Sequence, residues 1–193
     1  CLALGMQRMV RRHALLRRLP AVEALGSATA ICSDKTGTLT QNAMTVTQVW
    51  TPDTQMAVTG EGYTPEGDFY ADKTQVAPAE LPASVKLLLQ TGLLCNDAYI
   101  ETSGEEETHR TWRMVGDPTE GALVVAAAKA GYWINDNALT RQAELPFDSE
   151  RKAMTVVYET AGTALDTGQL GLAAAGTAPL LAMVKGAPDM VLD

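Results

Sequence analysis

Residues 31–42 read ICSDKTGTLTQN, and the interpretation of the whole chain starts from them. The short apolar run 28–33 (ATAICS) predicts a buried strand, and residues 34–37 predict a turn that ends it. Asp34 therefore stands where a strand gives way to a glycine-containing loop. A side chain at such a position is held by the strand and remains exposed to a ligand.

The residues after Asp34 suit a phosphoryl group. Lys35 supplies a cation, while Thr36, Gly37 and Thr38 supply hydroxyls and backbone N–H groups that can surround an anion. A carboxylate in this setting can attack phosphorus and become an aspartyl phosphate. Such chemistry requires magnesium, which takes oxygen ligands and neutralises the phosphate oxygens.

The residue two positions after Asp34 carries further information. Phosphatases with a strand–Asp–loop layout commonly have a second aspartate there, which acts as general acid and then as base for water. In this chain the position is Thr36, which cannot perform acid–base catalysis near neutral pH. The sequence therefore predicts a phosphoenzyme that persists.

Composition limits the remaining possibilities. The chain has 193 residues, 46% of them hydrophobic, enough for one substantial core or two small ones. The net charge of −8 disfavours nucleic-acid binding, whereas five arginines and no acid within residues 1–20 make a membrane surface a candidate contact for that end. Three cysteines without a CxxC pair predict no disulfide framework or zinc site and fit a reducing cytosol. The absence of a long apolar stretch or signal-peptide layout predicts a soluble piece.

Periodicity and turn signals predict an α+β fold, an antiparallel sheet flanked by helices. Residues 61–82 are expected to be irregular surface, 101–108 an acidic loop and 160–179 a hairpin connection. In the helix at 84–98, Leu87, Leu88, Leu94 and Cys95 are expected to face inward. The other predicted elements are helices at 2–19, ended by Pro20, and 117–130, ended by Gly131, with strands at 44–50, 55–59, 111–115, 152–159 and 180–185.

The stretch Ser33–Thr40 (SDKTGTLT) resembles the phosphorylation signature of P-type ATPases, the ion pumps. Three other segments resemble motifs of the same family: 147–152 (FDSERK) its adenine-binding segment, 185–189 (KGAPD) its KGAPE motif with Asp for Glu, and 117–120 (DPTE) the segment that presents a glutamate to the adenine amino group. The resemblance implies that ATP is bound by Glu120, Phe147, Arg151, Lys152, Lys185 and Gly186. It also implies that Mg²⁺ is bound by Asp34 and by the backbone carbonyl of Thr36.

Three of these residues also have a purely structural interpretation. Glu120 is the third residue of a helix start in which Asp117 caps, so its carboxylate could complete a capping box. Phe147 could belong to the core, and Lys185 could be a solvated lysine at the end of a strand. Stacking on a base is worth roughly 1–3 kcal/mol, so the role of Phe147 is measurable.

The resemblance also implies a domain organisation. Residues 1–20 would be a basic, stalk-like helix, 21–42 the start of an incomplete HAD-like phosphorylation domain, and 43–193 the nucleotide-binding domain. The full-length protein would be a cation pump, calcium-type by its TQNAM continuation and its Arg151-Lys152 pair, anchored by membrane helices with this portion facing the cytoplasm. Because no GDG-x-x-ND or TGD stretch is present, the fragment is expected to bind ATP without turnover.

Two other classes of protein remain open. One is a HAD-type phosphatase with an inserted cap domain, which Thr36 and the adenine-type segment disfavour. The other is a non-catalytic module that senses nucleotides. Nucleotide binding without phosphomonoester hydrolysis would distinguish a pump from a phosphatase.

Overall fold

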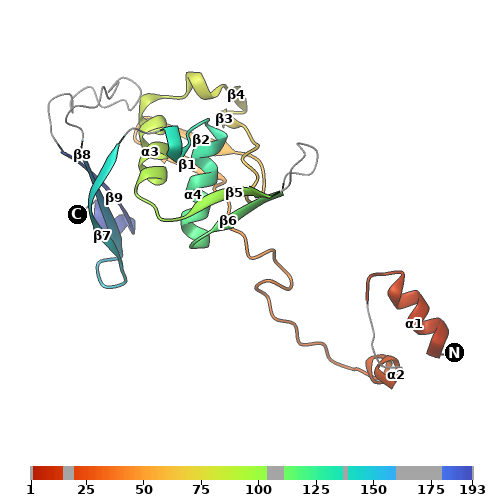
Figure 1. Cartoon of the computed structure of the whole chain (residues 1–193). Coiled ribbons are helices and arrows are strands. Elements are labelled where there is room, and N and C mark those ends of the chain that lie inside the picture. The colour runs from red at the N-terminus through yellow and green to blue at the C-terminus, as the bar shows by residue number, and fades with distance from the viewer. Residues whose placement is uncertain (1, 15–19, 104–110, 137–138, 160–179, 193) are drawn as a thin grey trace. The chain divides into compact units, whose positions relative to one another are not determined.

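A computed structural model describes residues 2–14, 20–103, 111–136, 139–159 and 180–192 (Figure 1). The chain divides into two compact units, Cys1–Asn42 (unit 1) and Ala43–Asp193 (unit 2). The predicted connection at 160–179 and most of the predicted acidic loop lie outside the described residues. Among the described helices, none is long and apolar enough to cross a bilayer.

Unit 1 has two short helices, α1 Leu2–Val10 and α2 Pro20–Gly26. The predicted single helix over 2–19 is wrong in its length. The helix ends at Val10, and His13 then adopts a left-handed conformation with φ of 61°, which an α-helix of L-residues does not tolerate. Pro20 begins α2 rather than ending a helix, a position where its missing N–H costs nothing.

The strand predicted at 28–33 is also wrong. These residues form no ladder with any strand that the structure describes, and Ile31 is 89% exposed. A strand is stabilised by hydrogen bonds to a neighbour, and the described part of unit 1 contains no strand with which this segment could pair. The apolar run therefore has no regular secondary structure and leads to the Asp34 loop.

Unit 2 contains a four-stranded antiparallel sheet with the order β1-β2-β3-β4. Its strands are β1 Gln48–Thr51, β2 Thr54–Val58, β3 Phe69–Ala71 and β4 Thr74–Val76. The predicted hairpin around Thr51-Pro52-Asp53 is confirmed. The expectation of irregular surface over 61–82 is wrong, because β3, β4 and the 3₁₀ turn Pro78–Glu80 lie there.

Two helices cover this sheet, α3 Ala83–Leu94 and α4 Pro118–Lys129. They pack on each other and complete the main core with buried side chains of the sheet, among them Met56 and Phe69. The buried face of α3 is formed by Val85, Leu89 and Leu93, spaced four apart. Leu94 and Cys95 are buried as expected, Leu87 is half-buried, and Leu88 is exposed, which corrects its predicted inward position.

Two strands beside α4 form a separate antiparallel pair, β5 Tyr99–Ser103 and β6 Thr111–Val115. β6 has the predicted bounds, whereas β5 replaces the start of the predicted acidic loop. Trp112 on β6 stacks on Trp133, and the ring centroids are 5.7 Å apart. Trp133 directly precedes the 3₁₀ turn Ile134–Asp136.

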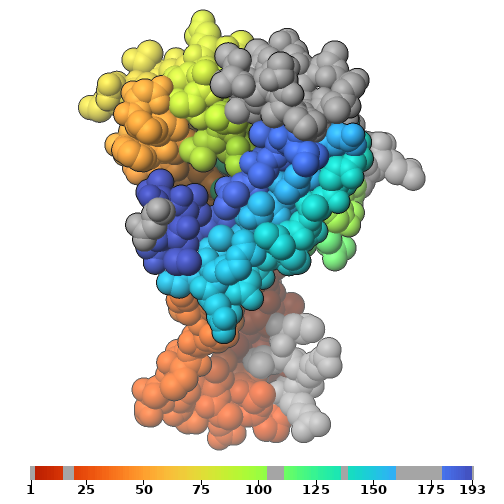
Figure 2. Space-filling view, turned by 90° about the vertical axis from the view of Figure 1, so that its left-hand side faces the viewer, coloured from red at the N-terminus to blue at the C-terminus, as the bar shows by residue number. Residues whose placement is uncertain are grey.

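A three-stranded antiparallel sheet completes unit 2, with β7 Thr140–Asp148, β8 Ala153–Glu159 and β9 Leu180–Gly186 in that order. β8 and β9 confirm the predicted strands, and β7 was not predicted. Figure 2 shows the three strands side by side, with the short helix α5 Pro188–Val191 next to β9.

This sheet is joined to the end of α3 by a second cluster of buried side chains, which includes Met154, Val156 and Met183. Two buried hydrogen bonds cross the junction. The Tyr158 hydroxyl donates to the Leu94 carbonyl at 2.7 Å, and the Cys95 thiol donates to the Met154 carbonyl at 3.5 Å. The sheet is therefore held against the helices by packing and by hydrogen bonds at one place.

Candidate functional site

A cavity of about 680 Å³ lies between the first turns of α4 and the β7–β9 sheet. Its volume is in the range of pockets that hold small molecules. It is lined by Asp117, Thr119, Glu120, Leu123, Phe147, Lys152, Lys185, Gly186 and Ala187.

The wall formed by α4 is fixed by a helix cap. The Asp117 carboxylate accepts hydrogen bonds from the N–H groups of Thr119, at 2.8 Å, and Glu120, at 3.4 Å. The hydrogen bond from the Thr119 N–H is the main reason why the pKa of Asp117 lies below its ordinary value. Asp117 therefore caps the helix as predicted, and this cap sets the direction in which Glu120 leaves the first turn.

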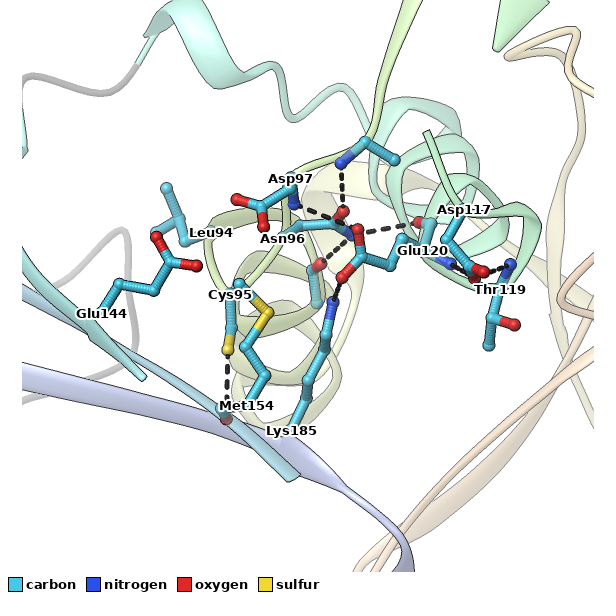
Figure 3. A network of polar contacts seen from close by, with 12 residues as sticks. Leu94, Cys95, Asn96, Asp97, Asp117, Thr119, Glu120, Glu144, Met154 and Lys185 are labelled. Atoms are coloured by element: carbon cyan, nitrogen blue, oxygen red, sulfur yellow. Dashed lines mark hydrogen bonds and ion pairs between the residues drawn. The ribbon is translucent and has the colours of Figure 1, made fainter. Parts of the chain in front are cut away.

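The Glu120 carboxylate points away from its own helix start (Figure 3). One oxygen accepts from the Lys185 ammonium at 2.5 Å, and the other accepts from the Asp97 N–H at 3.2 Å. The side chains of Lys185 and Glu120 are 18% and 16% exposed. Glu120 thus joins α4 to β9 and to the segment after α3. The capping box considered from the sequence would instead have placed its carboxylate on the Asp117 N–H.

Asn96 strengthens the same junction. Its side-chain amide donates to the carbonyls of Gly92, at 2.9 Å, and Glu120, at 3.0 Å, and its side-chain oxygen accepts from the Ala98 N–H at 2.8 Å. Asn96 is 7% exposed, so these bonds hold the backbone next to Asp97 in place. The N–H that holds Glu120 belongs to a rigid segment.

Phe147 forms the opposite wall of the cavity, near the end of β7. It is 60% exposed, so the interpretation of Phe147 as a core residue is wrong. The pairing of β7 with β8 shifts register between Leu145 and Asp148, and such an irregularity re-aims side chains. An exposed aromatic ring beside a cavity is available for stacking on a planar ligand.

Lys152 follows Phe147 across a tight turn. The Asp148 carboxylate accepts from the N–H groups of Arg151 and Glu150, at 2.9 and 2.8 Å, and these bonds, that of Arg151 above all, hold the pKa of Asp148 below its ordinary value. Lys152 has a left-handed backbone with φ of 48°. Its ammonium lies 3.4 Å from the Asp189 carboxylate of α5.

Gly186 lets two backbone segments approach each other at the base of the cavity. A Cβ atom at this position would lie 2.6 Å from the Lys152 carbonyl oxygen and 2.8 Å from the Ala153 Cβ. The Ala187 N–H donates to the same Lys152 carbonyl at 2.9 Å. Glycine is required here by space, because any side chain would separate the two segments.

The structure thus brings together five of the six residues predicted for one ligand, namely Glu120, Phe147, Lys152, Lys185 and Gly186. The sixth, Arg151, is exposed and does not line the cavity. Its guanidinium reaches the Thr155 hydroxyl at 3.5 Å.

The other predicted site lies in unit 1. Asp34, Lys35, Thr36, Gly37 and Thr38 are all exposed and form a turn in which Gly37 has a φ of 75°. Three N–H groups of this loop are used within it. Those of Leu39 and Thr40 donate to the Lys35 carbonyl, at 3.0 and 3.2 Å, and that of Gly37 donates to the Thr40 hydroxyl at 3.3 Å.

Two residues at the cavity, Leu123 and Asp97, were missed by sequence reasoning, and so was the contact that Asp189 makes. Leu123 lies three positions after Glu120 on the same face of α4, and helical periodicity could have found it. Asp97 contacts Glu120, and Asp189, which the KGAPD motif already included, contacts Lys152. No local pattern signals either contact.

Residues 84–193, which contain the whole cavity, match the family described as "P-type ATPase, cytoplasmic domain N". The match covers more than half of the chain, so the chain belongs to this family, as the resemblance of its motifs predicted. The fold agrees, with antiparallel sheets and a few helices.

Curated relatives extend the match. The "Cation-transporting ATPase pma1" of Synechocystis sp. is 44% identical over 169 residues, which are 83% of this chain and 18% of that protein. The "Calcium-transporting ATPase" of Bacillus subtilis is 45% identical over 161 residues, 82% of this chain and 17% of that protein. The "Calcium-transporting ATPase type 2C member 1" of Homo sapiens is 44% identical over 156 residues, 80% of this chain and 16% of that protein. The chain spans less than a fifth of the length of these relatives.

Proposed function

We propose that unit 2 binds ATP in the cavity between α4 and the β7–β9 sheet. The adenine ring stacks on Phe147, Glu120 accepts a hydrogen bond from the adenine amino group, and Lys152 and Lys185 contact the nucleotide with their ammonium groups. The main support is that Glu120, Phe147, Lys152, Lys185 and Gly186 come from three distant segments and line one cavity.

The ion pair between Lys185 and Glu120 is part of this proposal. It keeps the lysine ammonium at the cavity wall and reduces the positive charge that a ligand meets. An apolar ring next to a nearly neutral polar wall suits a purine base, which is flat, uncharged and edged by hydrogen-bonding groups. The charged phosphates then extend toward Lys152 and the more exposed rim.

We further propose that the full-length protein is an ATP-driven cation pump in which Asp34 accepts the γ-phosphoryl group. The carboxylate attacks phosphorus, ADP leaves, and an aspartyl phosphate forms. Lys35, Thr36, Gly37 and Thr38 surround the phosphoryl group. In this proposal residues 1–20 are the stalk-like helix, 21–42 begin the phosphorylation domain and 43–193 bind the nucleotide.

Magnesium belongs to the same proposal. The oxygen donors at this loop, the Asp34 carboxylate and the Thr36 carbonyl, are of the type that Mg²⁺ prefers and supply two of about six ligands. Among the described residues there is no group of three or more His, Cys, Asp or Glu side chains that could hold a metal ion. Mg²⁺ would neutralise the phosphate oxygens when it is bound with the nucleotide.

The transported ion and the location are proposed from the relatives. Two of the relatives above are called calcium-transporting, which supports calcium as the cation. A pump of this kind sits in the cell membrane through helices that lie outside the residues given, and this portion faces the cytoplasm. Such an orientation supplies the cavity with cytosolic ATP.

Titration of the full chain with ATP by calorimetry tests the nucleotide site. Phe147→Ala is expected to weaken binding by about 5- to 150-fold, the equivalent of 1–3 kcal/mol of stacking. Lys185→Ala is expected to weaken it as well. Tyr99→Ala is the matched control, because Tyr99 is also an exposed aromatic residue, 47% exposed, on a strand that does not line the cavity. Unchanged affinity in both cavity variants would refute the assignment.

Substrate profiling separates the pump from a HAD-type phosphatase. We expect ATP binding and no hydrolysis of small phosphomonoesters, because Thr36 replaces the general acid–base aspartate of such phosphatases. Phosphomonoester hydrolysis that is lost in Asp34→Asn would favour the phosphatase.

A further inference from the structure

We propose that Asp189 is a specificity-determining residue of the nucleotide cavity. Its carboxylate holds the ammonium of Lys152 and competes with the phosphate groups of the ligand for that charge. As a result, Asp189 reduces the preference of the cavity for nucleotides with more phosphates. This inference rests on the proposed function and names a residue that does not line the cavity itself.

The first support is the contact between the two side chains. The Lys152 Nζ lies 3.4 Å from the Asp189 carboxylate, and the side chains are 54% and 65% exposed. Lys152 lines the cavity, and Asp189 stands just outside it on α5. A phosphate group that approaches Lys152 therefore meets a carboxylate already bound to the same ammonium.

The second support is the rigid backbone on both sides of this contact. The Ala187 N–H donates to the Lys152 carbonyl, and Gly186 allows the close approach of the two segments. The turn before Lys152 is fixed by hydrogen bonds to the Asp148 carboxylate. Figure 2 shows this end of the β7–β8 hairpin next to α5. The chain thus holds the backbones of Lys152 and Asp189 near each other before any ligand binds.

The third support is the distribution of charge around the cavity. Its lining has two cations, Lys152 and Lys185, and two carboxylates, Asp117 and Glu120. Lys185 is paired with Glu120 inside the cavity, where both side chains are largely buried. Lys152 is then the lining cation nearest to solvent, and Asp189 adds a further negative charge beside it.

The expected consequence depends on the length of the phosphate chain. Adenosine carries no phosphate and does not compete with Asp189, so its binding is independent of this residue. ATP carries the largest negative charge, so it competes for Lys152 and is repelled by the carboxylate. AMP and ADP fall between these limits.

Calorimetric titration of the full chain with adenosine, AMP, ADP and ATP tests this dependence. Asp189→Asn is expected to tighten ATP binding by about two- to fivefold, the size of an exposed ion pair, and to leave adenosine binding unchanged. Asp189→Glu keeps the charge and is expected to bind ATP more weakly than Asp189→Asn. Glu150→Gln is the matched control. It also removes one negative charge near Lys152, because Glu150 lies in the turn between β7 and β8, and Glu150 does not line the cavity.

A second variant shows whether Lys152 carries the effect. In a chain with Lys152→Gln, the further change Asp189→Asn is expected to tighten ATP binding by less than it does in the wild-type chain. The inference would be overturned if Asp189→Asn raised the affinity for ATP equally in the wild-type and Lys152→Gln chains. It would also be overturned if the change raised the affinities for adenosine and ATP equally, or left the affinity for ATP unchanged. Absence of any nucleotide binding by the wild-type chain would instead refute the proposed function, so the two failures are distinguishable.

Discussion

Lys185 on β9 and Glu120 on α4, which are 65 residues apart in the chain, form an ion pair in which Nζ and Oε1 are 2.5 Å apart. Less than a fifth of either side chain is exposed. The second oxygen of Glu120 is held by the Asp97 N–H, so the carboxylate has a fixed orientation. This pair connects the helical part of unit 2 to the sheet that carries Phe147.

The first prediction concerns this pair. Glu120→Gln and Lys185→Met are each expected to lower the free energy of unfolding by about 1.5–3 kcal/mol, the worth of a hydrogen bond to a charged group. Each single change leaves the other charge largely buried without its partner. The double variant is therefore expected to lose less than the sum of the two, as measured by urea denaturation. Additive losses would show that the pair contributes little.

The second prediction concerns Gly186. Gly186→Ala is expected to destabilise the protein by about 1–3 kcal/mol, because the added Cβ would overlap the Lys152 carbonyl and force the two segments apart. ATP binding should weaken with it, since Lys152 moves. Gly26→Ala is the control, because a Cβ there meets nothing within 4 Å. Equal thermal stability and ATP affinity in the two variants would contradict the role of close approach.

The third prediction concerns the hairpin of β3 and β4. Phe69 on β3 is 1% exposed and belongs to the main core. Phe69→Ala is expected to cost about 3–5 kcal/mol in the free energy of unfolding. Tyr70→Ala, on the neighbouring half-buried position, is expected to cost less. Chemical denaturation of both variants measures the difference, and similar costs would mean that the hairpin does not complete the core.

The fourth prediction concerns pH. The pKa of Asp117 lies below its ordinary value of 3.8 because backbone N–H groups, that of Thr119 above all, stabilise the carboxylate. The unfolded chain then binds the proton more readily than the folded one. This contribution to stability is complete above 3.8 and is lost as the pH falls below that value toward the pKa of the folded state.

Asp117→Asn tests the sign of this effect. Asparagine also caps helices but does not titrate, so the melting temperature of the variant should fall less steeply as the pH is lowered from about 5 to about 3. Circular dichroism at a series of pH values measures both slopes. An unchanged slope would mean that Asp117 contributes nothing to the acid sensitivity.

The elements that sequence reasoning predicted correctly have strong local signals. The hairpin of β1 and β2 follows from the Pro52-Asp53 turn, and α4 follows from its cap at Asp117 and the left-handed Gly131 after its end. β8 is easy to recognise from the sequence because every second residue, Met154, Val156 and Tyr158, is apolar or aromatic, and these residues are buried in the structure.

The missed strands have weaker or conflicting local signals. The turn of the β3–β4 hairpin is made by Asp72 and Lys73, both with positive φ, where glycine or asparagine is the usual signature. In β7 the apolar residues Ala143, Leu145 and Phe147 alternate with polar ones, but Pro146 within the run argues against a strand, and all nine residues are exposed in the structure. The strand expected at 28–33 fails for the opposite reason, because an apolar run alone cannot supply a neighbouring strand.

Most of the residues that line the cavity were predicted from motifs, but the contacts between their side chains and distant residues were not predicted. Phe147, Lys152 and Lys185 were found because their local sequences resemble those of a known family. The pairing of Lys152 with Asp189 and of Glu120 with the Asp97 N–H depends on how distant segments meet. Such contacts are set by the packing of α3, α4 and the β7–β9 sheet, which one sequence does not reveal.

Glu159, the last residue of β8, is paired directly with Leu180, the first residue of β9. The ends of the two strands are thus already side by side, and neither borders the nucleotide cavity. Closing a loop costs free energy that rises only slowly with its length. Because these two ends are already paired, a peptide tag or fluorescent reporter inserted between them is expected to leave the register of β8 and β9 unchanged.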